Sequence, residues 1–182
     1  MTRLSRIAPR QGVPDFAVSL IGGGTWRLSE QAPETFTLAV FYRGYHCPIC
    51  RAYLNDLKRN REGFTSLGVE TIAISSDNEE RAQLTFDEWR LDGLTTGYDL
   101  ALSDALDLGL FVSSGVGKTS VGIEEPARFS EPGVFIIRSD GTLYYSSVQT
   151  MPFARPDFSQ LLKAVEYAVT KNYPARGEIT EL

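Results

Sequence analysis

The sequence predicts an α/β domain in which helices cover both faces of a mixed central β-sheet. The first supporting observation is the order of patterns: a strand pair, then strand, helix, strand and helix, then a second strand pair and a last helix. The second is the composition, because 42% of the 182 residues are hydrophobic, which is enough for one domain with a substantial core. We therefore expect residues 1–182 to form a single domain, with flexible tails at 1–11 and 172–182.

The first third of the chain predicts a hairpin, a strand and a long helix. Residues 15–20 and 25–28 are short strand-like runs, and three consecutive glycines supply the turn between them. Residues 35–42 are apolar and rich in residues that favour strands. A helix follows at about 48–67, where Pro48 suits the first position because its missing N–H costs nothing there. The apolar face of this helix carries Cys50, Tyr53, Leu54 and Leu57.

The remaining elements continue the alternation. Residues 69–75 predict a strand, and Ser76 with Glu79 three residues later is a capping box that opens the next helix. Asp140-Gly141 is a strong hairpin signal between two strand-like runs. The other expected elements are helices at about 76–91, 103–109 and 157–171 and strands at 134–138 and 142–148. The last helix places Phe158, Leu161, Leu162, Val165 and Val169 on one face.

One long segment has no periodic pattern. Residues 110–133 predict an irregular loop, and loops of that length in a compact domain are often functional or mobile. Gly117-Lys118-Thr119 matches the end of a phosphate-binding loop. The first glycine of that motif is replaced by Val112, and no strand closely precedes it. We therefore exclude nucleotide binding at this segment.

Charge and composition exclude several function classes. The net charge is −5, and the one basic run, residues 58–61, is typical of a solvated helix face rather than a nucleic-acid site. Residues 1–10 lack the apolar centre of a signal peptide, and no apolar run approaches the ~20 residues of a membrane span. With one histidine and two cysteines, a zinc site within one chain would need carboxylates to complete about four ligands, so a metal site is not expected. We expect a cytoplasmic protein without a metal or other cofactor, and without nucleic-acid or membrane partners.

The main candidate for chemistry is Cys47-Pro48-Ile49-Cys50, which contains the only two cysteines. At a strand-to-helix turn, free backbone N–H groups and the helix dipole stabilise a thiolate, which is the nucleophilic form. The pattern places Cys47 at the exposed helix start and Cys50 one turn further on the apolar face. Two buried structural thiols or a structural disulfide are the alternatives, but a loop this short removes little unfolded-state entropy. The spacing therefore favours redox chemistry.

Three segments carry a resemblance to a known family. Residues 41–50 resemble the active-site segment of the peroxiredoxins of the alkyl hydroperoxide reductase and thiol-specific antioxidant group (AhpC/TSA, or redoxin). Residues 72–77 resemble the second core strand of that group, and residues 131–141 resemble its late strand and hairpin. The resemblance covers roughly residues 12–170. It implies a thioredoxin-like fold with an N-terminal β-hairpin extension.

The active-site segment departs from the family pattern, Pro-x-x-x-Thr-x-x-Cys. In that register Arg43 takes the proline position, Cys47 the threonine position and Cys50 the position of the peroxidatic cysteine. A thiol therefore replaces the hydroxyl that orients a peroxide. Thioredoxins carry a buried Asp six residues before their first cysteine, where this chain has Phe41. The chain combines a thioredoxin-like cysteine pair with a peroxiredoxin-like frame.

A second departure precedes the late strand. Glu131 or Pro132 stands where the family's second active-site arginine normally lies, and Arg128 is close but out of register. Pro132 resembles the cis-proline of the fold, whose neighbouring backbone pairs with an extended substrate. We therefore expect Pro132 to be cis and in contact with the cysteine pair, with Glu131 as a polar contact beside the sulfurs.

Other residues near the pair have two readings each. Arg43 could stabilise a thiolate or be a solvated loop arginine. His46 could carry a proton, although a residue adjacent to Cys47 need not face the sulfur. Tyr42 and Tyr45 could shape the pocket, although aromatic packing is the more frequent explanation.

These residues predict a thiol–disulfide oxidoreductase in which Cys47 attacks and Cys50 resolves. One alternative is a thiol peroxidase that reduces hydroperoxides through Cys50. The other is a redox sensor or binding protein whose dithiol toggles without turnover. The expected partners are a thiol donor, such as a thioredoxin- or glutathione-type reductant, and a disulfide or hydroperoxide substrate. The candidate assembly is a homodimer.

Overall fold

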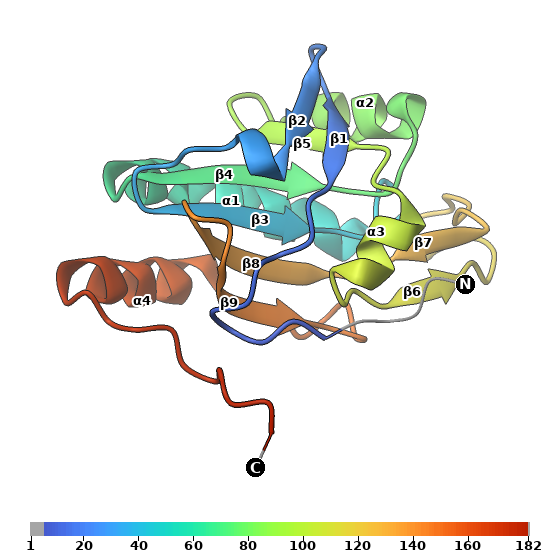
Figure 1. The fold of residues 1–182 in the computed structure, drawn as a ribbon. Coiled ribbons are helices and arrows are strands. Elements are labelled where there is room, and N and C mark those ends of the chain that lie inside the picture. The colour runs from blue at the N-terminus through green and yellow to red at the C-terminus, as the bar shows by residue number, and fades with distance from the viewer. Residues whose placement is uncertain (1–5, 182) are drawn as a thin grey trace.

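The computed structural model describes residues 6–181, which form a seven-stranded mixed sheet with helices on both faces (Figure 1). The strand order is β2-β1-β5-β4-β3-β8-β9. The sheet strands are β1 (Ala17–Leu20), β2 (Thr25–Arg27), β3 (Phe36–Phe41), β4 (Val69–Ile74), β5 (Thr95–Tyr98), β8 (Gly133–Arg138) and β9 (Leu143–Val148). The helices are α1 (Pro48–Ser66), α2 (Glu79–Glu88), α3 (Leu102–Asp107) and α4 (Phe158–Thr170), with a 3-10 turn at Leu28–Glu30. The predicted fold class is confirmed.

Strand β3 lies at the centre of the sheet and leads directly into the cysteine pair. It runs parallel to β4 and antiparallel to β8, and all six of its residues are buried. Its last residue, Phe41, is level with Ile74 of β4 and Gly133 of β8. The segment that joins β3 to α1 therefore emerges at the middle of one edge of the sheet, held between two neighbouring strands.

Two apolar layers cover the two faces of the sheet. Helices α1 and α4 lie on one face, and α3 lies on the other (Figure 1). Both cysteines belong to the first layer, together with Leu54 and Leu57 of α1 and Phe158 of α4. The second layer is built from Phe41, Ile74, Phe135, Ala105 and Leu108, among others. The predicted apolar face of α1 is confirmed, because Cys50, Leu54 and Leu57 are fully buried.

Strand β5 was not predicted, and Gly97 explains why. Glycine is unfavourable in strands, so the run Thr95–Tyr98 gives a weak strand signal. In the fold, however, a Cβ on Gly97 would lie 2.6 Å from Cγ2 of Val18 in β1. Close approach of two strands therefore requires this glycine.

The predicted start of α2 is wrong by two residues. The helix begins at Glu79, and its cap is Asn78, whose side chain accepts a hydrogen bond from the backbone N–H of Arg81 at 3.1 Å. The hydroxyl of Ser76 instead accepts a bond from the backbone N–H of Ser130 at 3.1 Å. The capping box fails because Ser76 serves a long-range contact that the local sequence does not reveal.

The segment predicted as an irregular loop contains a small antiparallel ladder. Strand β6 (Val112–Ser114) pairs with β7 (Arg128–Ser130), and Phe129 is buried. Each strand has three residues, which is too short for a periodic pattern to be recognised. The ladder brings residues 125–131 next to the cysteine loop.

The two terminal segments lie together beside β9. The Arg10 side chain donates a hydrogen bond to the carbonyl of Ala175 at 3.0 Å and forms an ion pair with Glu178 at 3.2 Å. Ala175 is buried. The predicted flexibility of 1–11 and 172–182 stays a prediction, and residues 1–5 and 182 lie outside the described residues. Within residues 6–181, no helix is long and apolar enough to cross a membrane.

Candidate active site

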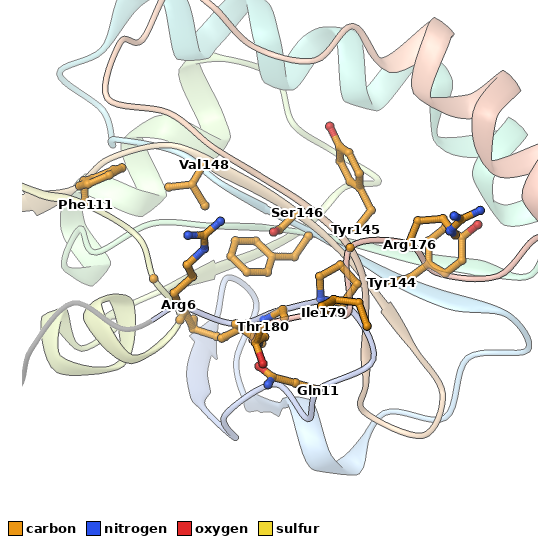
Figure 2. Close-up of a pocket in the computed structure, with 17 residues that line it drawn as sticks. Arg6, Gln11, Phe111, Tyr144, Tyr145, Ser146, Val148, Arg176, Ile179 and Thr180 are labelled. Carbon is orange, nitrogen blue, oxygen red and sulfur yellow. The ribbon is translucent and has the colours of Figure 1, made fainter. Parts of the chain in front are cut away.

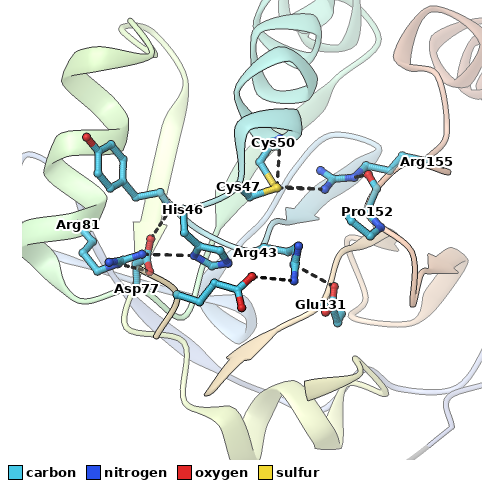
Figure 3. The surroundings of a disulfide bond; sticks show 11 residues. Arg43, His46, Cys47, Cys50, Asp77, Arg81, Glu131, Pro152 and Arg155 are labelled. Atoms are coloured by element: carbon cyan, nitrogen blue, oxygen red, sulfur yellow. Dashed lines mark hydrogen bonds and ion pairs between the residues drawn. A yellow bond between two sulfur atoms is a disulfide. The ribbon is translucent and has the colours of Figure 1, made fainter. Parts of the chain in front are cut away.

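The two cysteines are joined as a disulfide across the first turn of α1 (Figure 3). Cys47 is the N-cap residue, and Pro48 occupies the first helical position. Their Cα atoms lie 5.3 Å apart, which is within the usual range for a disulfide. The sulfur of Cys47 also accepts a hydrogen bond from the backbone N–H of Cys50 at 3.3 Å. The helix start thus supplies a donor to Cys47, as the sequence predicted.

Both sulfurs are buried, so the predicted exposure of Cys47 is wrong. Cys47 is 2% exposed and Cys50 is 0% exposed. A segment remote in sequence, the loop between β9 and α4, brings Arg155 to the helix start (Figure 3). Local sequence could place Cys47 at a helix start, but it could not show which other segment covers that start.

Arg155 is a charged residue that contacts both sulfurs. Its Nη2 lies 3.2 Å from the sulfur of Cys50 and 3.8 Å from that of Cys47. Its Nε donates a hydrogen bond to the carbonyl of Pro152 at 2.7 Å, and its guanidinium lies 4.9 Å from the ring centre of Tyr53. Burial lowers the pKa of Arg155 to about 10, so the side chain stays positive at neutral pH. A positive charge this close to a thiol stabilises the thiolate.

Tyr53 fixes the loop that carries Arg155. Its hydroxyl donates a hydrogen bond to the carbonyl of Pro156 at 2.9 Å, and its ring packs on Phe158 at a centre distance of 4.5 Å. Burial raises the pKa of Tyr53, so the phenol remains protonated and keeps this bond. Arg155 is not among the site residues predicted from the sequence. The one available signal is that the family's second active-site arginine is missing before the late strand. Another segment would therefore have to supply a positive charge at the site.

Arg43 lies near the site, but its guanidinium is paired with carboxylates. Its side chain forms ion pairs with Glu125 at 3.4 Å and with Glu131 at 3.3 Å, and its guanidinium lies 4.6 Å from the ring centre of Phe129. The Glu131 carboxylate also accepts a hydrogen bond from the hydroxyl of Ser113 at 2.6 Å. Arg43 is therefore only partly exposed and is paired with carboxylates rather than with a sulfur, and it joins the cysteine loop to residues 125–131.

Pro132 follows a trans peptide bond, which corrects the expectation of a cis-proline. Residues 6–181 contain no cis peptide bond. The backbone N–H of Glu131 donates to the carbonyl of Phe111 at 2.7 Å, and the carbonyl of Pro132 accepts from Gln149 at 3.0 Å. The chain thus runs extended from β7 into β8 with its backbone groups already paired. At residue 131 no backbone donor is free to pair with an extended substrate.

His46 is a neutral, buried residue. Its Nδ1 lies 3.3 Å from Nη2 of Arg81, and because a guanidinium only donates, Nδ1 must be the unprotonated nitrogen. Its ring packs on Phe129 at a centre distance of 4.6 Å. Burial, with Arg43 and Arg81 nearby, lowers the pKa of His46 to about 3. A group with that pKa does not carry protons near neutral pH. The geometry of His46 therefore supports a packing role.

Asp77 and Gly44 set the path of the cysteine loop. The fully buried Asp77 carboxylate accepts hydrogen bonds from the backbone N–H of Tyr45 at 2.7 Å and from Nε of Arg81 at 3.0 Å. Burial raises the pKa of Asp77, although both bonds oppose that shift. Gly44 has a φ of +129°, and a Cβ there would meet the Asp77 carboxylate. Asp77 and Arg81 are not among the site residues predicted from the sequence, although Asp77 ends the segment 72–77 that resembles the family.

The two predicted tyrosines pack rather than face the sulfurs. Tyr42 is fully buried against Trp89, with ring centres 6.2 Å apart. Tyr45 stacks on the same Trp89, with ring centres 6.4 Å apart, and its hydroxyl donates to Glu88 at 2.8 Å. Both therefore link the cysteine loop to the end of α2.

The comparison with protein families decides the assignment. A sequence profile of the AhpC/TSA family matches residues 9–146, which is more than half of the chain. The chain belongs to the AhpC/TSA family. Together with the cysteine pair, this membership makes the chain a thiol-dependent oxidoreductase. No curated protein matches the chain.

Solved structures share the fold of this AhpC/TSA chain. Peroxidoxin BcpB from Mycobacterium tuberculosis is 17% identical, covers 88% of this chain and 97% of its own, and has a TM-score of 0.68. A cysteine-to-serine mutant of peroxiredoxin 6 from Arenicola marina is 19% identical, covers 92% and 76%, and has a TM-score of 0.71. A putative thiol:disulfide interchange protein DsbE from Chlorobium tepidum is 17% identical, covers 90% and 99%, and has a TM-score of 0.65. At these identities the likeness shows the fold alone, and it confirms the predicted thioredoxin-like fold.

In this AhpC/TSA protein, replacing Gly44 by alanine should destabilise the fold by about 3 kcal/mol or more. The cost combines a positive φ, which L side chains rarely adopt, with a clash against a carboxylate fixed by two hydrogen bonds. Gly24→Ala is the matched control, because Gly24 has a φ of +88° but nothing within 4 Å of the added carbon. We expect about 1 kcal/mol for the control in urea unfolding. Equal losses in the two variants would contradict the contact with Asp77.

His46 should make the AhpC/TSA fold sensitive to mild acid. The unfolded chain takes up a proton near pH 6.5, whereas the native state does so only near its pKa of about 3. The stabilisation is therefore complete above pH 6.5 and is lost as pH falls. At pH 5 the loss should be about 2 kcal/mol in the free energy of unfolding.

Urea unfolding of the wild type and of His46→Gln at pH 7, 6 and 5 checks this expectation. His46 is the only histidine, so the variant removes every imidazole from the chain. Asp77, with its raised pKa, shifts stability in the opposite direction, but it is present in both proteins. The wild type should lose more stability than the variant between pH 7 and 5. Parallel pH profiles would show that the native state does not lower the pKa of His46.

Proposed function

We propose that this chain is a thiol–disulfide oxidoreductase whose Cys47–Cys50 pair cycles between disulfide and dithiol. The observation that carries the proposal is the pairing of both sulfurs in the first turn of α1, with one guanidinium 3.2 and 3.8 Å from them. A structural role for the pair explains neither the buried cation nor the donor at the helix start. The expected electron donor is a thiol reductant of the thioredoxin or glutathione type.

The proposed reduction follows the geometry of the two sulfurs. A donor thiolate attacks Cys47, the S–S bond breaks, and Cys50 leaves as a thiolate beside Arg155. A second donor thiol, as its thiolate, attacks the mixed disulfide, so that Cys47 leaves with the electron pair and the donor departs as a disulfide. In the opposite direction, the Cys47 thiolate attacks a substrate disulfide and Cys50 resolves the mixed disulfide. Each cycle transfers two electrons and needs no other cofactor.

The second candidate is peroxide reduction at Cys50, which the shorter distance to Arg155 favours. In this reaction the Cys50 thiolate attacks one oxygen of a hydroperoxide and the O–O bond breaks. The products are an alcohol or water, which takes up a proton, and a sulfenic acid on Cys50. The Cys47 thiol then displaces water from the sulfenic acid, and the same disulfide results.

Access to the buried sulfurs requires the loop between β9 and α4 to move. This loop exposes two large apolar side chains, Met151 at 54% and Phe153 at 72%. They precede Arg155 closely in sequence, so they offer an apolar contact to a reductant that approaches the disulfide. A cytoplasmic location and a homodimer are the setting and the assembly that we propose.

Two turnover assays separate these functions. The reduced protein is tested for reduction of insulin disulfides and for consumption of hydrogen peroxide, each with dithiothreitol as donor. The proposed exchange predicts insulin reduction that both Cys47→Ser and Cys50→Ser abolish. Peroxide consumption that survives in Cys47→Ser, with a sulfenic acid on Cys50, would support the peroxidase instead. Neither activity, in a protein whose disulfide still forms reversibly, would overturn the enzyme and leave a sensor.

A further inference from the structure

One cavity lies away from the cysteines, where the terminal segments run beside β9 (Figure 2). It has a volume of about 850 Å³, and residues 6–11 and 176–180 form part of its wall. Neither cysteine lines it, and Arg155 and Arg43 do not line it either. Its floor includes Phe135, which belongs to the apolar layer opposite the disulfide. The cavity is therefore separate from the redox site.

Hydrogen bonds, an ion pair and backbone packing hold the wall of the cavity in place. Arg10 joins the two terminal segments through the Ala175 carbonyl at 3.0 Å and Glu178 at 3.2 Å. Gly177, with a φ of +97°, packs its backbone against Pro9, where an added Cβ would lie 3.5 Å from Cγ. On the opposite side, the backbone N–H of Arg10 donates to the carbonyl of Leu143 at 2.7 Å. The wall is thus fixed to the start of β9.

The cavity combines an apolar surface with positive charge. Aromatic and aliphatic residues make up more than half of the lining, among them Ile7, Leu108, Phe111, Phe135, Val148 and Ile179. Among the described residues, the charged ones that line it are Arg6 and Arg176, although the chain as a whole has 23 acidic and 18 basic residues. Within residues 6–181, neither guanidinium has a hydrogen bond or ion pair to another side chain or backbone group. Arg6 is exposed, and Figure 2 shows its guanidinium extending toward Val148 and Ser146.

We propose that this cavity binds a small organic anion with an aryl or acyl body. The carboxylate would pair with Arg6, which has no other partner among the described residues, and the hydroxyl of Ser146 would offer a neutral donor beside it. The apolar body would lie against Phe135 and Val148, which belong to the same apolar layer of the sheet. A neutral ligand of the same shape would gain no charge-assisted hydrogen bond from Arg6.

Isothermal titration calorimetry of the full chain tests this site with two carboxylates, 4-phenylbutyrate and decanoate. Each is compared with its own amide, which keeps the shape and removes the charge. We expect at least one carboxylate to bind and its amide to bind at least tenfold more weakly. Arg6→Gln should lower the carboxylate affinity at least tenfold, because a charge-assisted hydrogen bond is lost. Ser146→Phe should abolish binding by filling the cavity.

Arg128→Gln is the control, because it removes the same charge from an exposed position outside the cavity. It should bind like the wild type. Three results would overturn the proposal: no heat from either carboxylate at millimolar concentration, equal affinity for acid and amide, or equal losses in Arg6→Gln and Arg128→Gln. The outcome is independent of the redox proposal, since the double variant Cys47→Ser/Cys50→Ser should bind as the wild type does.

Discussion

Replacing Arg155 by methionine is expected to slow alkylation of the reduced protein by iodoacetamide at pH 7 by about tenfold or more. The guanidinium lies 3.2 and 3.8 Å from the two sulfurs and is largely removed from water, so its attraction for a thiolate is weakly screened. Without it the thiol pKa rises and the reactive thiolate becomes rarer at neutral pH. Methionine keeps an apolar stem against Tyr53, so the loop retains much of its packing.

The same variant should make the disulfide harder to reduce. Arg155 stabilises the thiolate product of reduction but finds no anion in the disulfide, so its removal lowers the reduction potential. A tenfold change in the equilibrium constant corresponds to about 30 mV for this two-electron couple. Equilibration with glutathione redox buffers measures the shift.

Arg128→Met is the matched control for both measurements. Arg128 is the exposed arginine closest to the family's usual position, and β7 carries it. We expect no change in alkylation rate or reduction potential. If the two variants behave alike, Arg155 covers the sulfurs without stabilising a thiolate.

The second large effect concerns which sulfur attacks. We expect Cys50→Ser, which keeps Cys47, to alkylate several-fold faster than Cys47→Ser and with the lower apparent pKa. The reason is the hydrogen bond that the backbone N–H of Cys50 donates to the Cys47 sulfur at the helix start. Exposure does not distinguish the two sulfurs, because both cysteines are buried. Multiple-turnover exchange should be lost in both variants, by about a hundredfold or more, since each lacks the partner thiol.

Alkylation of the two variants across pH, followed by mass spectrometry, gives both quantities. If Cys47→Ser reacts faster than Cys50→Ser, the nucleophile is Cys50. The contact of 3.2 Å between Arg155 and the Cys50 sulfur would explain that result. Peroxide-dependent sulfenic acid in that variant would select the peroxidase. Circular dichroism of each variant controls for loss of the fold.

The parts of the fold that sequence predicted are those with strong local signals. The strand 35–42 and the helix that follows it are specified by an apolar run, Pro48 and a repeated apolar face, all within one stretch of chain. The hairpin at Asp140-Gly141 is equally local. The position of Cys47 at the helix start follows from these elements, and it was predicted correctly.

The missed features of the site depend on contacts between distant segments. Arg155 reaches Cys50 across 105 positions of sequence, and no spacing rule links the two. The burial of Cys47 has the same origin, because the loop that carries Arg155 covers it. The carboxylate of Asp77 binds the loop at Tyr45 from a distance of 32 residues. These contacts arise because the topology of the sheet places the ends of β3, β4 and β9 at the same edge.

The most direct test of the central claim is the mass of the intact wild-type chain after mild oxidation, with peptide mapping of the linked cysteines. We predict the loss of two hydrogens, a single linkage between Cys47 and Cys50, and full recovery of both thiols with dithiothreitol. The Cys47→Ser variant should show no such loss. Two thiols that remain free in excess oxidant, or a linkage only between two chains, would contradict a redox centre at the start of α1.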